Sequence, residues 1–385
     1  PAALHHISNK YGTLPLHSLL EPAILLARDG FPTYERLITA LRVAEKSRTL
    51  SPKFKEIFMP NGKLPIIGQT IKQPELSKTL ETLATLGHEG FYNSALTKTM
   101  VEEAKKDGSI WNMEDFKSYS VTEREPISIS FLGAKITMAP PPSSGGTTIA
   151  TILNIISEFN FLEMNPSERA HLITESMRRA YRDRAFNLGD PDFVDIPIER
   201  LISKKHAKKL SQTIKLDLAT PIHLDDGIDG KVAWNEGAHT THFSILDKSG
   251  NRAAVTQTIN TWFGSGYMLP SAGLILNNEM DDFSAKPFAP NRYGLVHGEQ
   301  NSIQPNKRML SSMTPTFIES DRGLAILGTP GGARIITMVL ISIIDYITGG
   351  DAESMTSNKR FHHQYLPDVI RYEVDAFTNE VKKDL

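Results

Sequence analysis

The chain has 385 residues, and its 42 Lys and Arg residues nearly balance its 44 Asp and Glu residues, which gives a formal net charge of −2. This balance disfavours a nucleic-acid or anionic-membrane partner, because binding to phosphate is driven mainly by clustered Lys and Arg. Hydrophobic residues make up 40% and charged residues 22%, which is typical of a globular protein with a substantial core. The chain has no cysteine, which excludes disulfides, Cys-ligated metals and a Cys nucleophile.

The first hundred residues contain four predicted helices, recognised by helix start and stop signals. They span residues 16–29, 34–47, 74–86 and 94–107. Three of them are expected to stop at a glycine, namely at Gly30, Gly87 and Gly108.

The middle of the chain predicts two strands and then two helices. Residues 127–138, interrupted by Gly133, predict a pair of short strands. After three prolines, a helix is expected to begin at Thr147. Ser167 is expected to cap a second helix that reaches Ala185, because a serine hydroxyl can accept from the first free N–H groups of a helix.

A β-hairpin is predicted after residue 240. Two segments rich in β-branched residues, 241–247 and 251–260, are separated by a three-residue loop that ends in glycine. A loop of this kind with Gly in the left-handed position pairs Asp247 with Asn251, and this pairing fixes the register of the two strands.

The register decides which side chains share a face of the hairpin. Phe243 faces Val255 on one side, and Thr240 faces Thr258 on the other. Asn260 lies two residues beyond Thr258, so we expect it to project from the same face as the two threonines. The hairpin by itself would then assemble a small polar cluster.

The remaining length contains one apolar run, at residues 335–344, which Asp345 ends. The run is about half of the ~20 residues that a bilayer core requires, so it predicts a core helix and no membrane span in this chain. Residues 1–30 lack the features of a signal peptide, and Pro1 stands where an initiating Met would be, so we expect less than a full gene product. No linker or repeat divides the sequence, which favours one large composite domain.

The common catalytic signatures are missing from the sequence: there is no G-x-S-x-G elbow, H-E-x-x-H motif, Walker loop or G-x-G-x-x-G after a strand. The adjacent histidine pairs 5–6 and 362–363 are not spaced to share a helical face. We therefore expect neither a metal nor a cofactor.

Three segments carry polar groups that could line a site, and each has an ordinary alternative. The acidic segment 277–282 lacks the alternation and the Gly of a calcium loop, so a solvated turn is its alternative. The glycine-rich segment 328–334 could present backbone N–H groups as an anion or oxyanion nest, or could be only a tight turn. Ser311 and Ser312 offer two hydroxyl groups in an irregular, Pro-bounded stretch, which alone is a weak signal.

Taken in order, five segments resemble the signature of γ-glutamyltranspeptidases. They are residues 240–244, 258–260, 276–284, 311–313 and 330–332. Residues 140–146 and 188–191 are also similar to large-subunit segments of that family. The resemblance therefore covers essentially the whole chain.

This resemblance implies an α+β fold, the four-layer αββα sandwich of two antiparallel sheets found in N-terminal-nucleophile hydrolases. It also implies two subunits from one precursor. Residues 1–239 would be the large-subunit portion, incomplete at its N-terminus relative to the family, and residues 240–385 the small-subunit portion. The two portions would form one composite domain.

The implied activity is that of a γ-glutamyl transferase and hydrolase acting on glutathione and related compounds, with water, amino acids or peptides as acceptors. The Thr240 hydroxyl would attack the carbonyl of His239, and hydrolysis of the resulting ester would free the α-amine of Thr240. This amine, with a reference pKa of about 7.7–8.0, would serve as the general base for its own hydroxyl. Thr258 resembles a second threonine that polarises the nucleophile; the alternative is an ordinary strand residue.

The resemblance also implies which residues bind substrate. Asn260, Glu279 and Asp282 would hold the α-amino end of a γ-glutamyl group. Ser311 and Ser312 would help to hold its α-carboxylate.

Two further contacts follow from the same resemblance. Backbone N–H groups of Gly331 and Gly332 would form the oxyanion hole. Tyr293 resembles the aromatic residue of a lid loop that bonds to the Asn260 position, and a surface-loop tyrosine is its alternative. A periplasmic or extracellular location is implied as well.

The sequence departs from the family at both ends. The family's large subunit normally contributes an arginine for the substrate α-carboxylate, upstream of the region that matches Pro1, and the family usually continues beyond residues 360–364. Two other hypotheses stay open. One is a related cephalosporin acylase or poly-γ-glutamate-processing enzyme with the same nucleophile, and the other is an unprocessed, truncated protein without catalytic activity.

Overall fold

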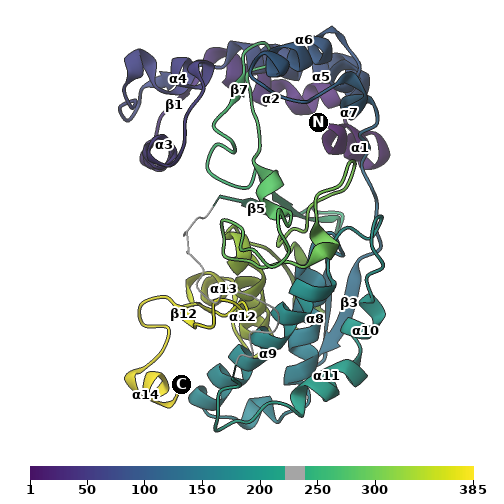
Figure 1. Ribbon diagram of the computed structural model, residues 1–385, viewed down its shortest axis with the longest axis vertical. Coiled ribbons are helices and arrows are strands. Elements are labelled where there is room, and N and C mark those ends of the chain that lie inside the picture. Colours follow the sequence, from purple (N-terminus) through teal and green to yellow (C-terminus); the bar gives the residue numbers. More distant parts are fainter. Residues whose placement is uncertain (222–238) are drawn as a thin grey trace. The chain divides into compact units, whose positions relative to one another are not determined.

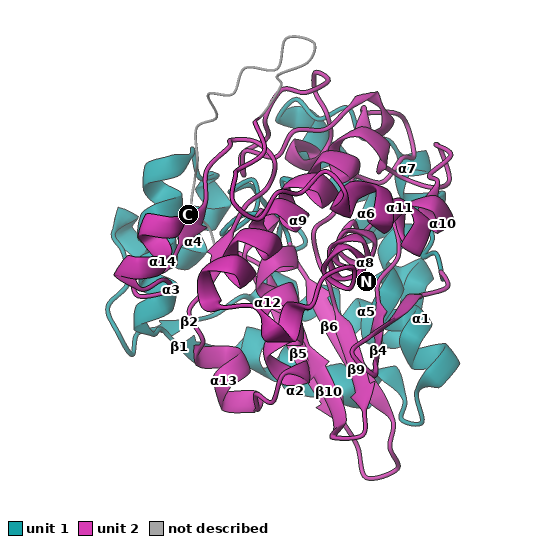
Figure 2. Cartoon of the chain, turned by 90° about the horizontal axis from the view of Figure 1, so that it is seen from below, with its two compact units in different colours: residues 1–123, 259–278 teal, residues 124–258, 279–385 magenta. Residues whose placement is uncertain are grey.

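The computed structural model describes residues 1–221 and 239–385. The chain forms two compact units, coloured separately in Figure 2. Unit 1 contains residues 1–123 and 259–278, and unit 2 contains residues 124–258 and 279–385, apart from the part of that range that is not described. The division expected after residue 239 concerns cleavage of the polypeptide rather than packing, and it stays a prediction.

Unit 1 is mainly helical. Its elements are α1 (Ala2–Tyr11), α2 (Leu16–Asp29), β1 (Phe31–Pro32), α3 (Glu35–Ser47), α4 (Pro52–Phe58), η1 (Pro60–Gly62), β2 (Thr70–Ile71), α5 (Pro74–Tyr92), α6 (Ala95–Lys106), α7 (Met113–Lys117), β7 (Met268–Leu269) and β8 (Leu274–Ile275). Figure 1 shows these helices in purple and blue. The returning segment 259–278 is part of the unit because its apolar residues pack into both of the unit's buried clusters, through Leu269 in one and Met268 in the other.

Unit 2 combines helices with antiparallel strands. Its elements are β3 (Ile127–Phe131), β4 (Ala134–Met138), α8 (Gly145–Ile156), η2 (Phe161–Glu163), α9 (Pro166–Asn187), α10 (Ile198–Leu201), α11 (Lys204–Ser211), β5 (Thr241–Leu246), β6 (Arg252–Gln257), η4 (Glu279–Asp282), η5 (Glu299–Asn301), β9 (Thr316–Ser320), β10 (Gly323–Leu327), η6 (Gly332–Arg334), α12 (Ile335–Ile347), α13 (Ala352–Ser357), β11 (Phe361–His362), β12 (Arg371–Tyr372) and α14 (Asn379–Asp384). The predicted α+β class with antiparallel sheets is confirmed.

A four-stranded sheet with the order β10-β9-β4-β3 organises unit 2. Strands β3 and β4 turn at Leu132 and Gly133, which both have positive φ angles, of 46° and 82°. The hairpin thus bends where the sequence predicted it, since Gly adopts positive φ at little cost. Ile136 of β4 pairs with Ile318 of β9, and neither side chain is exposed.

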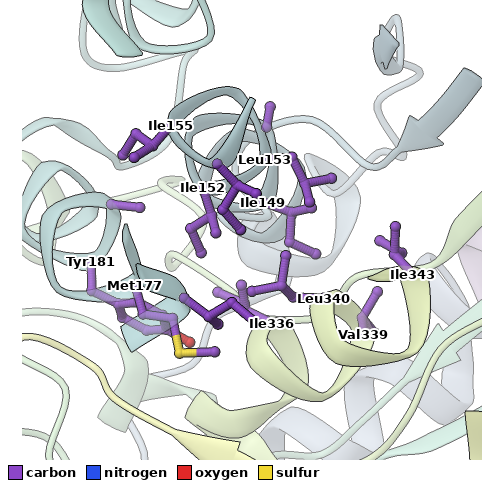
Figure 3. Packing of buried hydrophobic residues seen from close by; sticks show 14 of the residues in the cluster. Ile149, Ile152, Leu153, Ile155, Met177, Tyr181, Ile336, Val339, Leu340 and Ile343 are labelled. Carbon is purple, nitrogen blue, oxygen red and sulfur yellow. The ribbon is translucent and has the colours of Figure 1, made fainter. Parts of the chain in front are cut away.

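Helices α8, α9 and α12 supply most of the core of unit 2. Every residue of α8 is buried, as expected of a helix enclosed by its neighbours. In Figure 3 the side chains of the three helices point toward one another. The labelled members are Ile149, Ile152, Leu153 and Ile155 of α8, Met177 and Tyr181 of α9, and Ile336, Val339, Leu340 and Ile343 of α12. The apolar run near residue 340 is therefore a core helix, as predicted, and no helix in the described residues is long and apolar enough to cross a membrane.

The hairpin β5–β6 has the predicted register. Phe243 pairs with Val255, and the Asp247 N–H donates to the Asn251 carbonyl at 3.0 Å. Gly250 has a φ of 84°, so it takes the left-handed position that the loop requires. The register of the two strands therefore follows from the geometry of this loop.

Candidate active site

Thr240 directly precedes strand β5 and is buried, with 8% of its surface exposed. The last pair in the ladder is Thr241 with Gln257. Thr240 and Thr258 are the next residues outward, beyond the last pair of the ladder, so their facing across the hairpin stays a prediction. A direct contact between their two hydroxyl groups is a prediction as well.

The face of the hairpin that follows Thr240 is polar and hydrogen-bonded. His242 Nδ1 lies 2.7 Å from Thr256 Oγ1, and His242 Nε2 lies 3.1 Å from Ser244 Oγ. Ser244 Oγ donates to the carbonyl of Ile326 in β10 at 2.9 Å. This face is thereby fastened to β10, whereas Phe243 on the opposite face is 43% exposed.

A hollow of about 480 Å³ lies beside this polar face. His242 and Ser244 line it together with residues of β10, α12 and α13. Its lining includes none of the ten site residues predicted from the sequence. The site residues predicted from the sequence therefore do not line this hollow.

The glycine turn before α12 has a backbone that only glycine adopts readily. Gly331 and Gly332 have φ angles of 147° and 57°. The carbonyl of Ala333 accepts from the Tyr181 hydroxyl at 2.7 Å, which anchors the turn to α9. Since the first N–H groups of a helix have no acceptor within the helix, this turn before a 13-residue helix can offer N–H donors to an anion.

The Tyr293 ring lies against this turn. A methyl group built on Gly332 would be 2.5 Å from Tyr293 Cε1. Tyr293 is 7% exposed, so it is not the freely exposed loop residue of the alternative interpretation. Electrostatic repulsion from Asp282 and Glu279 adds to burial in raising the pKa of its hydroxyl, which places the ring close to both carboxylates.

The acidic segment is a partly buried 3-10 turn, η4, rather than a solvated one. Burial raises the pKa of the Glu279 carboxyl to about 7, opposed by its hydrogen bond with Asp282. Burial and the neighbouring charges of Glu279 and Asp281 raise the pKa of Asp282 well above its ordinary value, whereas the Arg184 cation lowers it. The net shift of both pKa values is upward even with Arg184 nearby, so the two carboxyl groups form an interacting pair that favours holding a proton.

Two asparagines hold the acidic turn in place. Asn291 Nδ2 donates to Asp282 Oδ1 at 3.1 Å, and Asn301 Nδ2 donates to the Asp282 carbonyl at 2.6 Å. Asn301 is fully buried, and its Oδ1 accepts from the Leu310 N–H at 3.0 Å. One buried amide thus ties the acidic turn to the residue that precedes Ser311.

The double serine is fixed on its other side by the segment that follows the prolines. Ser311 N–H donates to the Pro142 carbonyl at 2.8 Å, and Ser144 N–H donates to the Ser311 carbonyl at 2.7 Å. Ser312 Oγ accepts from Arg184 at 3.3 Å. In unit 2, Gly332 therefore lies against Tyr293 and Arg184 bonds to Ser312, while Tyr293 and Arg184 each act electrostatically on the acidic pair.

Arg184 was not predicted from the sequence, and neither was its neighbour His297. Arg184 is 2% exposed and His297 is 1% exposed. Arg184 stands in α9, four residues before the segment 188–191 that resembled the family, and this proximity was the available signal. Its partners lie far away along the sequence, so no local pattern could reveal them.

Asn260 differs from the expectation. It belongs to unit 1, where its Nδ2 donates to the Asn278 carbonyl at 3.0 Å. Strand β6 ends at Gln257, and Asn260 has a φ of 71°. The alternation of the strand therefore does not extend to Asn260, because the backbone is no longer extended there, and a common face with Thr258 stays a prediction.

Comparison with known proteins shows the family to which the chain belongs. The sequence matches the family model described as Gamma-glutamyltranspeptidase over residues 1–385. It is 41% identical over 370 residues to a glutathione hydrolase proenzyme of Escherichia coli (strain K12), covering 95% of this chain and 63% of that protein. A glutathione hydrolase proenzyme of Pseudomonas sp. (strain A14) is 37% identical over 392 residues, covering 100% of this chain and 67% of that protein.

Solved structures give the same result for the fold. A cephalosporin acylase from Bacillus halodurans superposes with a TM-score of 0.81 at 22% identity, covering 100% of this chain and 68% of that one. The Helicobacter pylori γ-glutamyltranspeptidase superposes with a TM-score of 0.54 at 37% identity, covering 56% of this chain and 63% of that one. The chain belongs to the γ-glutamyltranspeptidase family and has the N-terminal-nucleophile hydrolase fold.

Proposed function

We propose that this chain carries the reaction centre of a γ-glutamyl transferase and hydrolase that acts on glutathione and related γ-glutamyl amides. The observation that carries the proposal is the place of Thr240, buried directly before β5 in a chain that matches the family over its whole length. The buried acidic pair supports it further, because two clustered carboxyl groups suit a substrate that carries an ammonium group.

The first reaction is cleavage of the chain itself. The Thr240 hydroxyl oxygen attacks the carbonyl carbon of His239, and the C–N bond between the two residues breaks to leave an ester. Water then hydrolyses the ester, which gives a carboxylate at His239 and a free α-amine at Thr240. The large- and small-subunit portions, 1–239 and 240–385, arise from one precursor in this way, and the name proenzyme given to the relatives supports such a step.

The second reaction is transfer of the γ-glutamyl group. The free amine of Thr240 takes the proton of the hydroxyl as its oxygen attacks the γ-carbonyl, and the proton then passes to the leaving amine. A γ-glutamyl ester on Thr240 remains, and water or the amine of an amino acid or peptide resolves it. The Thr258 hydroxyl polarises the nucleophile from the neighbouring strand.

The head group of the substrate is held by charge complementarity. Glu279 and Asp282 pair with the α-ammonium group, while Ser311 and Ser312 donate to the α-carboxylate.

The reacting carbonyl is held separately from the head group. N–H groups of Gly331 and Gly332 stabilise the developing oxyanion, a contact whose loss typically costs about 2.7–4 kcal/mol per donor in other enzymes. Tyr293 closes over the site, and its position against Gly332 supports this role.

We also propose that the protein works in the periplasm or outside the cell, as the resemblance to the family implies. The alternative acyl groups of cephalosporin acylases have support from the fold alone, since that likeness is at 22% identity. The coupled carboxyl pair favours an ammonium-bearing substrate over them.

The proposal is tested by replacing Asp282 with Ala in the protein at its natural length. A charge-assisted contact that loses one partner costs about 2–5 kcal/mol, so we expect turnover of a γ-glutamyl anilide to fall roughly 30- to several-thousand-fold. Self-cleavage should change little, because the carboxylate has no part in the attack on His239. Asp281→Ala is the matched control, since it removes the adjacent carboxylate, which accepts from the Arg292 N–H at 3.1 Å. Equal turnover in the Asp282 variant and the wild type would refute the assignment.

A further inference from the structure

All three nitrogen atoms of the Arg184 guanidinium group form hydrogen bonds within unit 2. Nε donates to Ser144 Oγ at 2.8 Å, one terminal nitrogen donates to His297 Nδ1 at 3.2 Å, and the other donates to Ser312 Oγ at 3.3 Å. The side chain comes from the last turn of α9 and is almost completely buried. Burying an ion to this extent costs free energy unless its surroundings stabilise the charge, so the presence of a buried arginine here calls for an explanation.

Through Ser144, Arg184 also acts on Ser311, the other serine of the double serine. Ser144 Oγ accepts from Arg184 and donates to the Ser311 carbonyl at 2.6 Å, beside the backbone bond to the same carbonyl. Arg184 therefore fixes Ser312 directly and Ser311 through one hydroxyl group.

The direct contact also determines what Ser312 can do. Its oxygen accepts from the guanidinium, so its own proton is free to point toward a ligand. A serine held in this way is oriented as a donor, which is the role that binding of a carboxylate requires.

The charge of Arg184 acts on the acidic turn. Of the groups that face Asp282, Glu279 and Asp281 are negative and raise its pKa, whereas Arg184 is positive and lowers it. The Tyr293 hydroxyl stays neutral because burial and the same carboxylates raise its pKa.

His297 does not add a competing positive charge. Burial and the neighbouring guanidinium hold the pKa of its imidazole well below the ordinary value, so Nδ1 is free to accept from Arg184. The guanidinium is thus the cation that acts on Asp282 from the helix side.

We infer that Arg184 is a positioning residue for the substrate head group: its fork orients Ser312 and Ser311 toward the α-carboxylate, and its charge balances Asp282 on the ammonium side. This inference rests on the proposed function. It goes beyond that function by assigning one buried arginine to both halves of head-group recognition.

The test measures two properties of Arg184→Met and Arg184→Lys in the protein at its natural length. One is the Kd of L-glutamate by calorimetry between pH 5 and pH 9, because glutamate carries the same head group and needs no turnover. The other is kcat and KM for a γ-glutamyl anilide. Arg184→Met loses the hydrogen bonds that orient the two serines toward the charged ligand, so glutamate binding should weaken about 10- to 150-fold. For the anilide, KM should rise by a larger factor than the factor by which kcat falls.

The pH dependence separates positioning from simple structural support. Without the cation, Asp282 should hold its proton to higher pH, so the midpoint below which glutamate binding weakens should move up by about one unit or more. Arg184→Lys keeps the charge but loses the planar fork, so it should restore the midpoint and only part of the affinity. In a double-mutant cycle, Ser312→Ala should cost less affinity in Arg184→Lys than in the wild type, because the two residues act through one contact.

Arg179→Met is the matched control. Arg179 is on the same helix and is 7% exposed, but its guanidinium donates to Thr213 and pairs with Glu175. Its replacement should lower the melting temperature while the Kd and its pH midpoint stay at wild-type values.

The outcomes separate the inference from the function on which it rests. Wild-type Kd and midpoint in Arg184→Met, or equal shifts in Arg179→Met, would overturn the positioning role. Should Arg184→Met fail to fold, a wild-type Kd in Arg184→Lys together with an additive cycle would overturn it. Glutamate binding without turnover in the wild type would refute the proposed activity and leave Arg184 to be judged by its Kd, and absence of glutamate binding in the wild type would refute both.

Discussion

Glu279 and Asp282 illustrate how burial prepares a residue pair for a cationic ligand. Their carboxyl groups share a hydrogen bond, and burial raises both pKa values. An ammonium group placed beside them would supply the missing positive charge and release the proton. The same arrangement must destabilise the protein at neutral pH when no ligand is bound.

The first prediction concerns Glu279→Gln. The folded pKa of Glu279 is raised from 4.5 to about 7, so the folded state binds more protons than the unfolded state between these values, and stability from this group is lost as pH rises through them. Glutamine cannot ionise. The variant should therefore be more stable than wild type at pH 8 by about 1–3 kcal/mol and similar at pH 4.5.

Denaturant unfolding at the two pH values measures this difference. Glu163→Gln, in an exposed turn, is the control and should change stability equally at both. A Glu279→Gln protein whose stability follows the wild-type pH curve would show that the carboxyl is not desolvated.

The second prediction concerns Thr258→Val, which preserves shape and strand propensity but removes the hydroxyl. If that hydroxyl polarises Thr240, both self-cleavage and turnover should slow by about 10²- to 10⁴-fold, as is typical of assisted proton transfer. Stability should change little, and Thr258→Ser should keep more activity. If rapid-quench measurements gave wild-type rates for both self-cleavage and turnover in Thr258→Val, Thr258 would have no part in polarising Thr240.

For single residues, the sequence predicted those positions that depend on the geometry of a nearby turn. The register of β5 and β6 follows from a three-residue loop, and the ladder from Thr241–Gln257 to Leu246–Arg252 has the predicted register. Arg184 could not be found in this way, because its partners Ser312 and His297 are 128 and 113 residues away in the sequence.

Among the elements, helix ends were predicted best where local signals act alone. Helix α2 spans Leu16–Asp29 as expected, and Gly30 follows it with a φ of 99°. The stop expected at Gly87 is confirmed in the backbone: Gly87 leaves the helical conformation with φ 59° and ψ −141°, and a second helical stretch follows it to Tyr92 within α5. Phe91 and Tyr92 of this second stretch are buried in the unit 1 core, and this long-range packing is what the local signal at Gly87 could not reveal.

Two helix starts were also placed too late. Helix α9 begins at Pro166, and Asn165 caps it by accepting from the Glu168 N–H, so Ser167 is not its cap. Helix α8 begins at Gly145 rather than Thr147. In both cases a Pro or Gly beside the start delayed the expected boundary, although Pro is favoured in the first turn of a helix.

The third prediction belongs to the turn before α12. Gly332→Ala places a methyl group 2.5 Å from Tyr293 Cε1 at a φ of 57°, so the turn must shift. We expect turnover of a γ-glutamyl anilide to fall by about 10²–10³-fold, as when one oxyanion donor is lost. Gly349→Ala, at another positive φ but with open space around it, is the control for backbone strain. Equal loss of kcat in both variants would contradict an oxyanion role for this turn.

For the molecule as a whole, the sequence predicted the fold class but not the division into two units. The chain passes between the units after residues 123, 258 and 278, and no change of composition marks these points. Segment 259–278 belongs with unit 1 because Met268 and Leu269 are buried there. Such long-range packing cannot be inferred from the periodicity of a short segment.

Cleavage before Thr240 is the most direct test of the account, because both proposed reactions depend on this hydroxyl. Intact mass spectrometry of the purified protein, followed over time, should show a cut between His239 and Thr240, with Thr240 at the new N-terminus. Thr240→Ala should remain a single polypeptide and should not turn over a γ-glutamyl anilide. Cleavage of the Thr240→Ala protein at the same bond and rate would contradict the assignment of Thr240 as the nucleophile.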